Sequence, residues 1–191
     1  TGSAIISLFE SLINDTQDAD LELTLLNNAK DKIESMRSWR MLLKLDSSLS
    51  TAKGEDYTTQ RTLPIGFKDM VRLVINKGEY IQFPFELRYE YENSGNRFSI
   101  DHLNSKFYIS ELFSIAYTIY IHYIHQTSDL TTATSPIWPA RFHPLLAFEM
   151  AVLQLEGLDV DEINKLNAEG IRRERDRLLQ EMIFWDSHLQ L

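Results

Sequence analysis

The amino-acid sequence contains no cysteine among its 191 residues. Disulfide bridges, thiolate zinc sites, iron–sulfur clusters and cysteine nucleophiles are therefore excluded. Long hydrophobic runs are also missing: Tyr, Ser, Glu and His side chains interrupt the longest apolar stretch, Phe107 to Ile124, whereas a membrane-spanning helix needs roughly 18 to 20 apolar residues. The first four residues have neither a basic region nor a clear cleavage site. We expect no signal peptide and no membrane association.

Positive charge is scarce. The chain has 19 Lys and Arg residues against 28 Asp and Glu residues, a net charge of −9. A surface with this net negative charge does not attract the phosphate backbone of DNA, which argues against a protein that binds DNA over its whole surface. The content of 43% hydrophobic and 25% charged residues is typical of a folded domain. The length suits one domain, or one domain with an arm.

Sequence signatures of the common enzyme classes are absent. There is no glycine-rich phosphate loop, no serine-nucleophile elbow and no paired-histidine zinc helix. Residues 159–161 open like a calcium loop, but Ile163 occupies the fifth position, where the loop needs an oxygen ligand. Asp159 with Glu162 resembles a helix capping box instead. We expect no metal, no cofactor and no enzymatic activity.

Four side chains define the enzymatic alternative. His122 and His125 are three residues apart, a spacing that places them on opposite faces of a strand. A small metal-assisted hydrolase would have to combine one of them with Asp101 or Glu111. Because the sequence offers no fixed third ligand, ordinary strand packing is the favoured interpretation of both histidines. His143, which precedes an apolar segment, is expected to make a cap or core hydrogen bond.

Residues 3–14 and 19–40 have the apolar spacing of helices. In the first range, Ile5 and Phe9 are four residues apart on one face, and the second range continues this spacing. Turn and cap residues at 14–18 separate the two. Since neither helix buries its apolar stripe alone, we expect an antiparallel helical hairpin.

Residues 42–127 are rich in aromatic and β-branched side chains, a composition typical of strands. Turn clusters predict a β-hairpin of residues 97–101 with 106–110. Residues 115–124 alternate in the manner of one long strand. Residues 87–92 are expected to form a single helical turn.

Residues 143–156 are predicted to form a buried helix, because they are apolar on nearly all sides. Glu149 lies within this apolar segment and needs a partner, either Arg141 or a neighbouring chain. We therefore expect Arg141 and Glu149 to form a buried ion pair. Gly157 is expected to end the helix.

Residues 158–191 are expected to form a helical arm, weakened or split at Gly170. Its apolar residues recur at helical spacing and need a partner surface. This seam consists of Ile171, Leu178, Met182, Trp185 and Leu189. We expect an α+β, mainly α fold: the helical hairpin and C-terminal helices pack around a small antiparallel β region, with residues 1–157 as the body.

Short motifs follow one another in a specific order along residues 20–157. They are Ser38-Trp39-Arg40, Leu63-Pro64-Ile65-Gly66-Phe67, Tyr117-Thr118-Ile119-Tyr120-Ile121-His122-Tyr123 and Pro139-Ala140-Arg141-Phe142-His143-Pro144-Leu145-Leu146. In this order the chain resembles the head-to-tail adaptor (connector) proteins of tailed bacteriophages, in particular the short-tailed type. The resemblance covers most of the chain, although each motif alone is weak.

The resemblance implies a structural virion protein, made in the cytoplasm of the host bacterium and located in the neck between portal and tail. It implies a homo-oligomeric ring, usually twelvefold, that binds the portal protein and the next tail or nozzle protein. Double-stranded DNA passes through such a ring without sequence-specific binding.

The resemblance also assigns residues. It places a portal-docking segment at residues 171–191, on the seam defined above. Packing of the body is assigned to Trp39, Leu63, Pro64, Phe67, Tyr117, Ile119, Tyr123, Phe142, Leu145 and Leu146. The segment 75–91 is longer than the family pattern predicts, so a stopper or tail-completion ring of the same neck remains an alternative. An acidic conduit would suit either role, because it repels DNA phosphates and lets the duplex slide.

Overall fold

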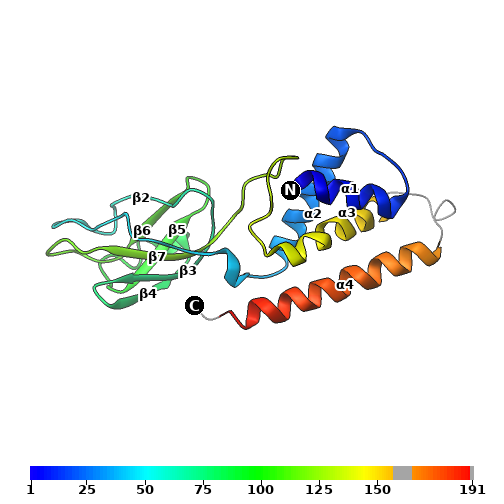
Figure 1. Cartoon of the computed structure of the whole chain (residues 1–191). Helices are drawn as coiled ribbons and strands as arrows, with labels where there is room; N and C mark the ends of the chain where they lie inside the picture. Colours follow the sequence, from blue (N-terminus) through cyan, green and yellow to red (C-terminus); the bar gives the residue numbers. More distant parts are fainter. Residues whose placement is uncertain (157–164, 190–191) are drawn as a thin grey trace. The chain divides into compact units, whose positions relative to one another are not determined.

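The computed structural model describes residues 1–156 and 165–189, and the chain divides into two compact units (Figure 1). The helical unit comprises Thr1–Met41 and Thr127–Leu191, and the β unit comprises Leu42–Gln126. The fold is α+β, with 40% helix and 21% strand. The predicted packing of the helices around the β region is therefore wrong, because the helices form a compact unit of their own. The predicted division into a body of residues 1–157 and an arm differs too, since the C-terminal helix belongs to the helical unit.

The helical unit is organised around α3 (His143–Glu156). The helices α1 (Gly2–Ile13), α2 (Ala19–Ser35) and α4 (Lys165–Ser187) all pack against it (Figure 1). The buried helix predicted for residues 143–156 is confirmed. The predicted hairpin differs, because α1 and α2 contact α3 more than each other. The reason is that α3 is apolar on nearly all sides and offers both helices a surface.

Local signals explain the bounds of α2. At its start, the Asp18 carboxylate accepts hydrogen bonds from the backbone N–H groups of Asp20 and Leu21. The helix ends at Ser35, although residues up to 40 were predicted to be helical. Beyond that end the chain folds back, and the indole N–H of Trp39 donates to the backbone carbonyl of Ile33 at 2.8 Å. The same carbonyl also accepts from the backbone N–H of Met36, so two hydrogen bonds close this end of the helix.

The helix α4 is continuous through Gly170, so the predicted split is wrong. A glycine inside a helix costs about 1 kcal/mol relative to alanine. Burial of Ile171, Leu178 and Met182 within the helical unit offsets that cost. The predicted helix end at Gly157 and the capping box of residues 159–162 lie outside the described residues.

The β unit is a curled, half-barrel sheet of seven strands in the order β1-β7-β3-β4-β5-β6-β2. The strands are β1 (Leu43–Asp46), β2 (Arg61–Thr62), β3 (Phe67–Ile75), β4 (Gly78–Gln82), β5 (Arg97–Asp101), β6 (Lys106–Ile109) and β7 (Ile119–His125). Neighbours are antiparallel except β4 and β5, which are parallel. The predicted hairpin of 97–101 with 106–110 is confirmed as β5–β6. The prediction of a purely antiparallel region is wrong at β4–β5, because η2 (Phe85–Leu87) and the turns after it carry the chain back to the same end.

The strand predicted for residues 115–124 begins later, as β7. Residues 113–118 pair instead with the loop at 49–55: the backbone N–H of Thr51 donates to Tyr117 and that of Gly54 donates to Phe113. These bonds satisfy the backbone without a ladder strand. The helical turn predicted at 87–92 is displaced too, since the short helix of this segment is η2.

Alternation along the strands builds the core of the β unit. On β7, Ile119, Ile121 and Tyr123 point into the core, while Tyr120 lies on the outer face. The core cluster is completed by residues of other strands and of two loops. The strand residues are Met70, Leu73, Ile75, Tyr80, Phe98, Ile100, Phe107 and Ile109, and the loop residues are Leu63 and Phe113.

Candidate interaction surfaces

The residues of the enzymatic alternative are engaged in local structure. His122 and His125 lie on β7, which β3 and β4 separate from β5 in the sheet order. The Asp101 carboxylate accepts from the backbone and side-chain N–H groups of Asn104, at 3.1 and 2.8 Å. The phenol of Tyr80 donates to Glu111. Across residues 1–156 and 165–189, no three His, Asp or Glu side chains form a group that would hold a metal ion.

Burial perturbs several titratable groups. Burial lowers the pKa of His125, and the positive charge of Lys44 lowers it further. Burial likewise raises the pKa of Glu34, although hydrogen bonds from Thr127 and Trp138 oppose the rise. His143 makes the expected core hydrogen bond, with its Nε2 atom 2.9 Å from the carbonyl oxygen of Trp138.

Glu149 is fully buried and joins three helices. Its carboxylate lies 2.7 Å from the Lys32 ammonium of α2 and 2.9 Å from the Arg175 guanidinium of α4. The predicted pair with Arg141 is wrong, because α2 and α4 supply both cations. The sequence showed that Glu149 needs a partner but not which residue supplies it. Lys32 and Arg175 are 117 and 26 positions away in the chain, and only the fold brings them to the carboxylate.

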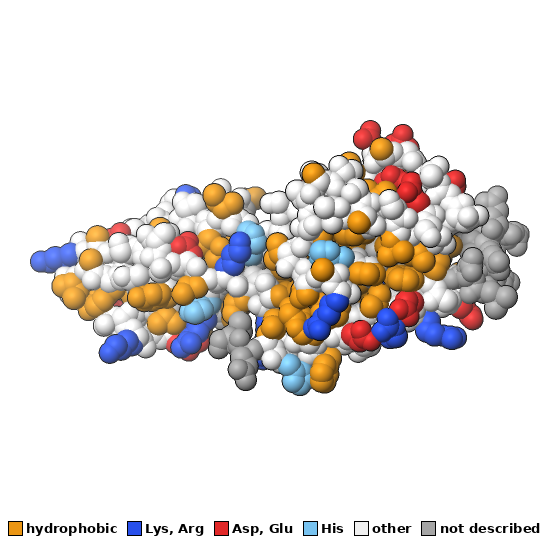
Figure 2. Space-filling model, viewed as in Figure 1, with side chains coloured by type: hydrophobic (Ala, Val, Ile, Leu, Met, Phe, Trp, Pro, Cys, Tyr) orange, Lys and Arg blue, Asp and Glu red, His pale blue; other side chains and the backbone are white. Residues whose placement is uncertain are grey.

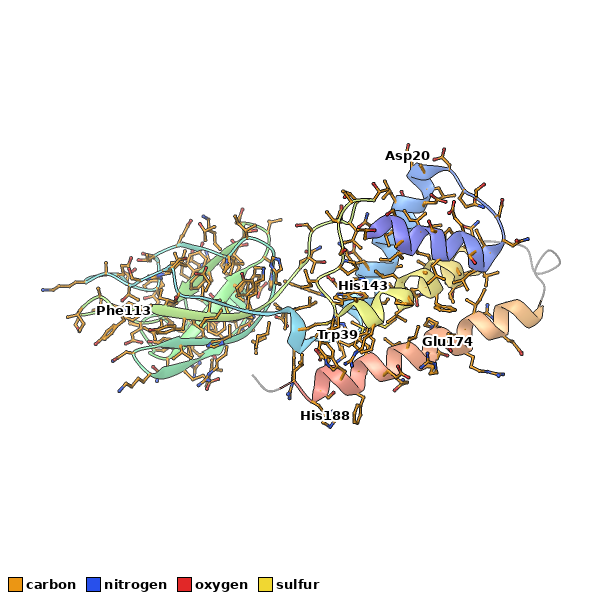
Figure 3. All side chains as sticks on the ribbon, in the orientation of Figure 1. Asp20, Trp39, Phe113, His143, Glu174 and His188 are labelled. Carbon is orange, nitrogen blue, oxygen red and sulfur yellow. The ribbon has the colours of Figure 1, made fainter. Side chains whose placement is uncertain are left out.

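Arg141 instead stacks on aromatic rings at one end of the helical unit. Its guanidinium carbon is 4.7 Å from the ring centroid of Phe142 and 5.5 Å from that of Trp185. Together with Phe184 and His188 these residues line an open, mostly apolar groove. We call it the aromatic groove. Figure 2 shows hydrophobic side chains gathered over this unit beside α3 and α4, and Figure 3 labels His188 at the end of α4.

The end of α4 that carries the groove is fixed in place. The buried carboxylate of Asp186 accepts from the backbone N–H groups of Arg40 and Met41 at 3.1 and 3.0 Å. It also lies 3.7 Å from the Arg37 guanidinium. The guanidinium of Arg40 donates to the carbonyl of Leu189. The aromatic groove is therefore a preformed surface rather than part of a loose arm.

Most residues of the predicted docking seam are already buried within the single chain. Ile171, Leu178 and Met182 are buried in the helical unit, while Trp185 and Leu189 are half-buried. Docking of this seam on a portal stays a prediction. Among the side chains of α4 that the structure describes, Phe184 is the most exposed apolar one, at 67%, and it lies outside the predicted seam.

The β unit carries its two most exposed aliphatic side chains on adjacent loops. Ile65 is 96% and Leu103 is 92% exposed. The backbone N–H of Leu63 donates to the carbonyl of Ser105 and joins the two loops, and the rings of Phe67 and His102 lie 6.4 Å apart. We call Ile65, Leu103 and the two loops that carry them, 62–67 and 102–105, the apolar tip.

Turn geometry directs Ile65 outward. The backbone N–H of Phe67 donates to the carbonyl of Pro64, which closes a turn with Ile65 at its corner. Gly66 follows with a φ of +71°, a conformation suited to glycine. A Cβ atom on Gly66 would lie 2.4 Å from the His125 ring. The Pro-x-Gly pattern in the sequence is typical of such a turn. Only the turn in the folded chain shows that an apolar residue, Ile65, lies at its corner.

We predict that Gly66→Ala lowers the free energy of unfolding by about 2 kcal/mol or more, because it combines backbone strain with a steric clash. Chemical denaturation followed by fluorescence measures the loss. Gly95→Ala is the matched control, since Gly95 has a similar φ of +70° but open space at its Cβ position. Equal losses in the two variants would contradict the proposed packing of His125 against the turn.

The residues assigned to body packing fall into both units. Trp39, Phe142, Leu145 and Leu146 are buried in the helical unit, and Leu63, Ile119 and Tyr123 are buried in the β unit. Pro64, Phe67 and Tyr117 are half-buried. These ten residues therefore contribute to the interior of one unit or the other rather than to one shared surface.

No protein-family model matches this chain, and no curated protein matches it either. Within the described residues, no helix has the length and apolar character needed to span a bilayer.

Proposed function

We propose that this chain is a structural protein of the neck of a tailed bacteriophage, an adaptor ring that joins the portal to the tail and forms part of the DNA conduit. It acts without catalysis, cofactor or metal. Copies of the chain are its first partners, and the portal and the next tail protein are the others. In this role α4 is the arm that docks on the portal.

The observation that carries the proposal is the presence of two separate apolar surfaces on the two units. The aromatic groove lies in the helical unit, and the apolar tip lies in the β unit. A ring requires each copy to use two different surfaces, one for each neighbour. The order of the sequence motifs and the acidic net charge of −9 support the same role.

The test is negative-stain electron microscopy of the purified protein, alone and mixed with the portal protein encoded in the same genome. We expect rings, or a collar added to the portal. A chain that stays monomeric and ignores the portal would overturn the proposal. A genome position next to portal and terminase genes would be independent support.

To test whether α4 docks on the portal, a point substitution is needed that leaves the helical unit folded. Deleting residues 171–191 would remove Arg175 from the buried Glu149 and strip α3 of packing, so the truncated chain would lose stability for reasons unrelated to docking. Phe184→Ser changes an exposed side chain of α4 instead. We expect this variant to remain folded by circular dichroism and to form fewer collars on the portal than the parent chain.

A further inference from the structure

The β unit contains a small cavity that shares no residue with the apolar tip. Its volume is about 140 Å³, and its walls come from three places in the chain. These are the turn between β3 and β4, the residue that precedes β5, and the segment that follows β6. We call it the Glu111 cavity, because Glu111 is the one charged residue among the described residues that line it.

The Glu111 carboxylate has a phenol as its partner and no cation. The buried Tyr80 donates its hydroxyl to the Oε2 atom of Glu111. Burial raises the pKa of Tyr80, and the hydrogen bond to Glu111 raises it further, so the phenol stays a neutral donor. Among the residues that the structure describes, no lysine or arginine forms an ion pair with Glu111, and no hydrogen bond reaches its Oε1 atom. A half-buried carboxylate in this state stabilises a cation that enters the cavity.

Four further polar side chains line the same cavity. They are Asn76, Asn96, Ser114 and Tyr117. In the part of the chain that the structure describes, none of the four side chains makes a hydrogen bond. The backbones of Asn76 and Asn96 are left-handed, with φ of +48° and +46°, a conformation that asparagine tolerates better than most residues. The cavity therefore presents several oxygen acceptors in addition to the carboxylate.

Apolar surface completes the lining. Phe113, which Figure 3 labels in the β unit, is buried, and its ring lies edge to face with that of Tyr117 at a centroid distance of 6.5 Å. Leu112 also lines the cavity and is 60% exposed. An alkyl chain that entered from solvent would contact Leu112 while its charged end reached Glu111.

These groups suit an ammonium ion better than other ligands. An ammonium group carries a compact charge and three N–H donors, and the oxygen acceptors of the cavity can receive all three. A guanidinium prefers to pair with both oxygens of a carboxylate, but one oxygen of Glu111 already accepts from Tyr80. A phosphate or carboxylate ligand would be repelled by Glu111.

We propose that the Glu111 cavity binds a primary ammonium group at the end of an unbranched alkyl chain, with Glu111 as its counter-charge. A lysine side chain of a partner protein and a free alkyl diamine share this chemistry. The inference goes beyond the proposed function and does not depend on it.

The first test is a titration of the full ¹⁵N-labelled chain with Nα-acetyl-lysine methylamide. Two-dimensional NMR follows the side-chain amide signals of Asn76 and Asn96, and we expect both to shift in a saturable manner. Nα-acetyl-norleucine methylamide has a similar alkyl chain without the ammonium group and should cause no saturable shift. A lysine derivative that leaves both signals unchanged would overturn the proposal.

The role of the carboxylate is tested with a charge-matched pair of variants. Glu111→Gln keeps an acceptor for Tyr80 and removes the charge, and we expect it to bind the lysine derivative at least about tenfold more weakly. Glu79→Gln removes the same charge on the neighbouring β4, where Glu79 is exposed and lies 3.3 Å from Arg72, and it should bind as the parent chain does. Equal weakening in the two variants would show general attraction to an acidic chain and overturn the site.

Two further ligands test the donors and the source of the ammonium group. The Nζ-trimethylated lysine derivative has no N–H donor, so it should bind about tenfold more weakly; equal or tighter binding would indicate an aromatic cage and overturn the assigned acceptors. A site for lysine side chains should bind 1,4-diaminobutane no more tightly than the lysine derivative. Diamine binding that is at least about tenfold tighter, and that Glu111→Gln abolishes, would support the cavity and assign it to a free diamine. All of these titrations use the chain without the portal, so their outcome is separate from that of the adaptor function.

Discussion

Replacing Trp39 with alanine is expected to lower the free energy of unfolding of the helical unit by about 4 kcal/mol. The side chain is fully buried, and its indole N–H donates to the carbonyl of Ile33 near the end of α2. The substitution therefore removes a large buried surface and one hydrogen bond and leaves a cavity. Urea denaturation followed by circular dichroism at 222 nm measures the helical loss.

Trp39→Phe is the control for this experiment, because it keeps an aromatic ring and removes the hydrogen-bond donor. We expect it to cost about half as much as the alanine variant or less. A loss below about 1 kcal/mol for Trp39→Ala would show that the segment after α2 is not anchored in the core.

The second large effect is expected at the buried carboxylate of Glu149. Arg175→Met removes one of its two cationic partners and should lower the free energy of unfolding by about 3 kcal/mol, because a buried charge loses its compensation. Adding Glu149→Met to this variant should recover much of the loss, since an apolar pair of similar volume needs no partner. The measurement is a double-mutant cycle by urea denaturation.

The same helix provides the control. Arg177 lies two residues further on, forms ion pairs with Glu174 and Glu181, and is half exposed. Exposed pairs of this kind are screened by solvent and contribute little to stability, so Arg177→Met should have little effect. Equal losses at positions 175 and 177 would contradict the role of burial.

These expectations also show where sequence patterns are informative. The apolar run of residues 143–156 predicted a buried helix, and α3 has those bounds, because a helix apolar on all sides has no stable place except the interior. The hairpin β5–β6 followed from its turn residues in the same way. Local chemistry determined both elements.

Patterns failed where contacts in the folded chain overrode the local preference. The second helix stops at Ser35 because Trp39 folds back onto it, and α4 continues through Gly170 because its apolar side chains are buried. The predicted Arg141–Glu149 pair failed for a related reason. The cations that reach Glu149 come from other helices, and Arg141 finds aromatic rings instead.

The candidate surfaces depend most on tertiary structure. The Pro64-Ile65-Gly66 pattern suits a turn, which was not predicted from the sequence, and the exposure of Ile65 beside Leu103 also required the pairing of two loops almost forty residues apart. The aromatic groove joins η3 (Ala140–Phe142) with the end of α4. A row of apolar residues at helical spacing shows that these side chains need apolar surroundings. Only the folded structure decides whether the core of the same chain provides those surroundings.

By itself, the sequence determined the class of fold, the acidic character, the absence of thiol chemistry, and the regions of helix and strand. Each of these follows from composition or from the period of apolar residues, which are local properties of the chain. Tertiary structure alone decided that α4 belongs to the helical unit, that Glu149 is neutralised by Lys32 and Arg175, and that two apolar surfaces stay exposed. Burial is a property of the packed chain, because each side chain is covered by residues remote in sequence.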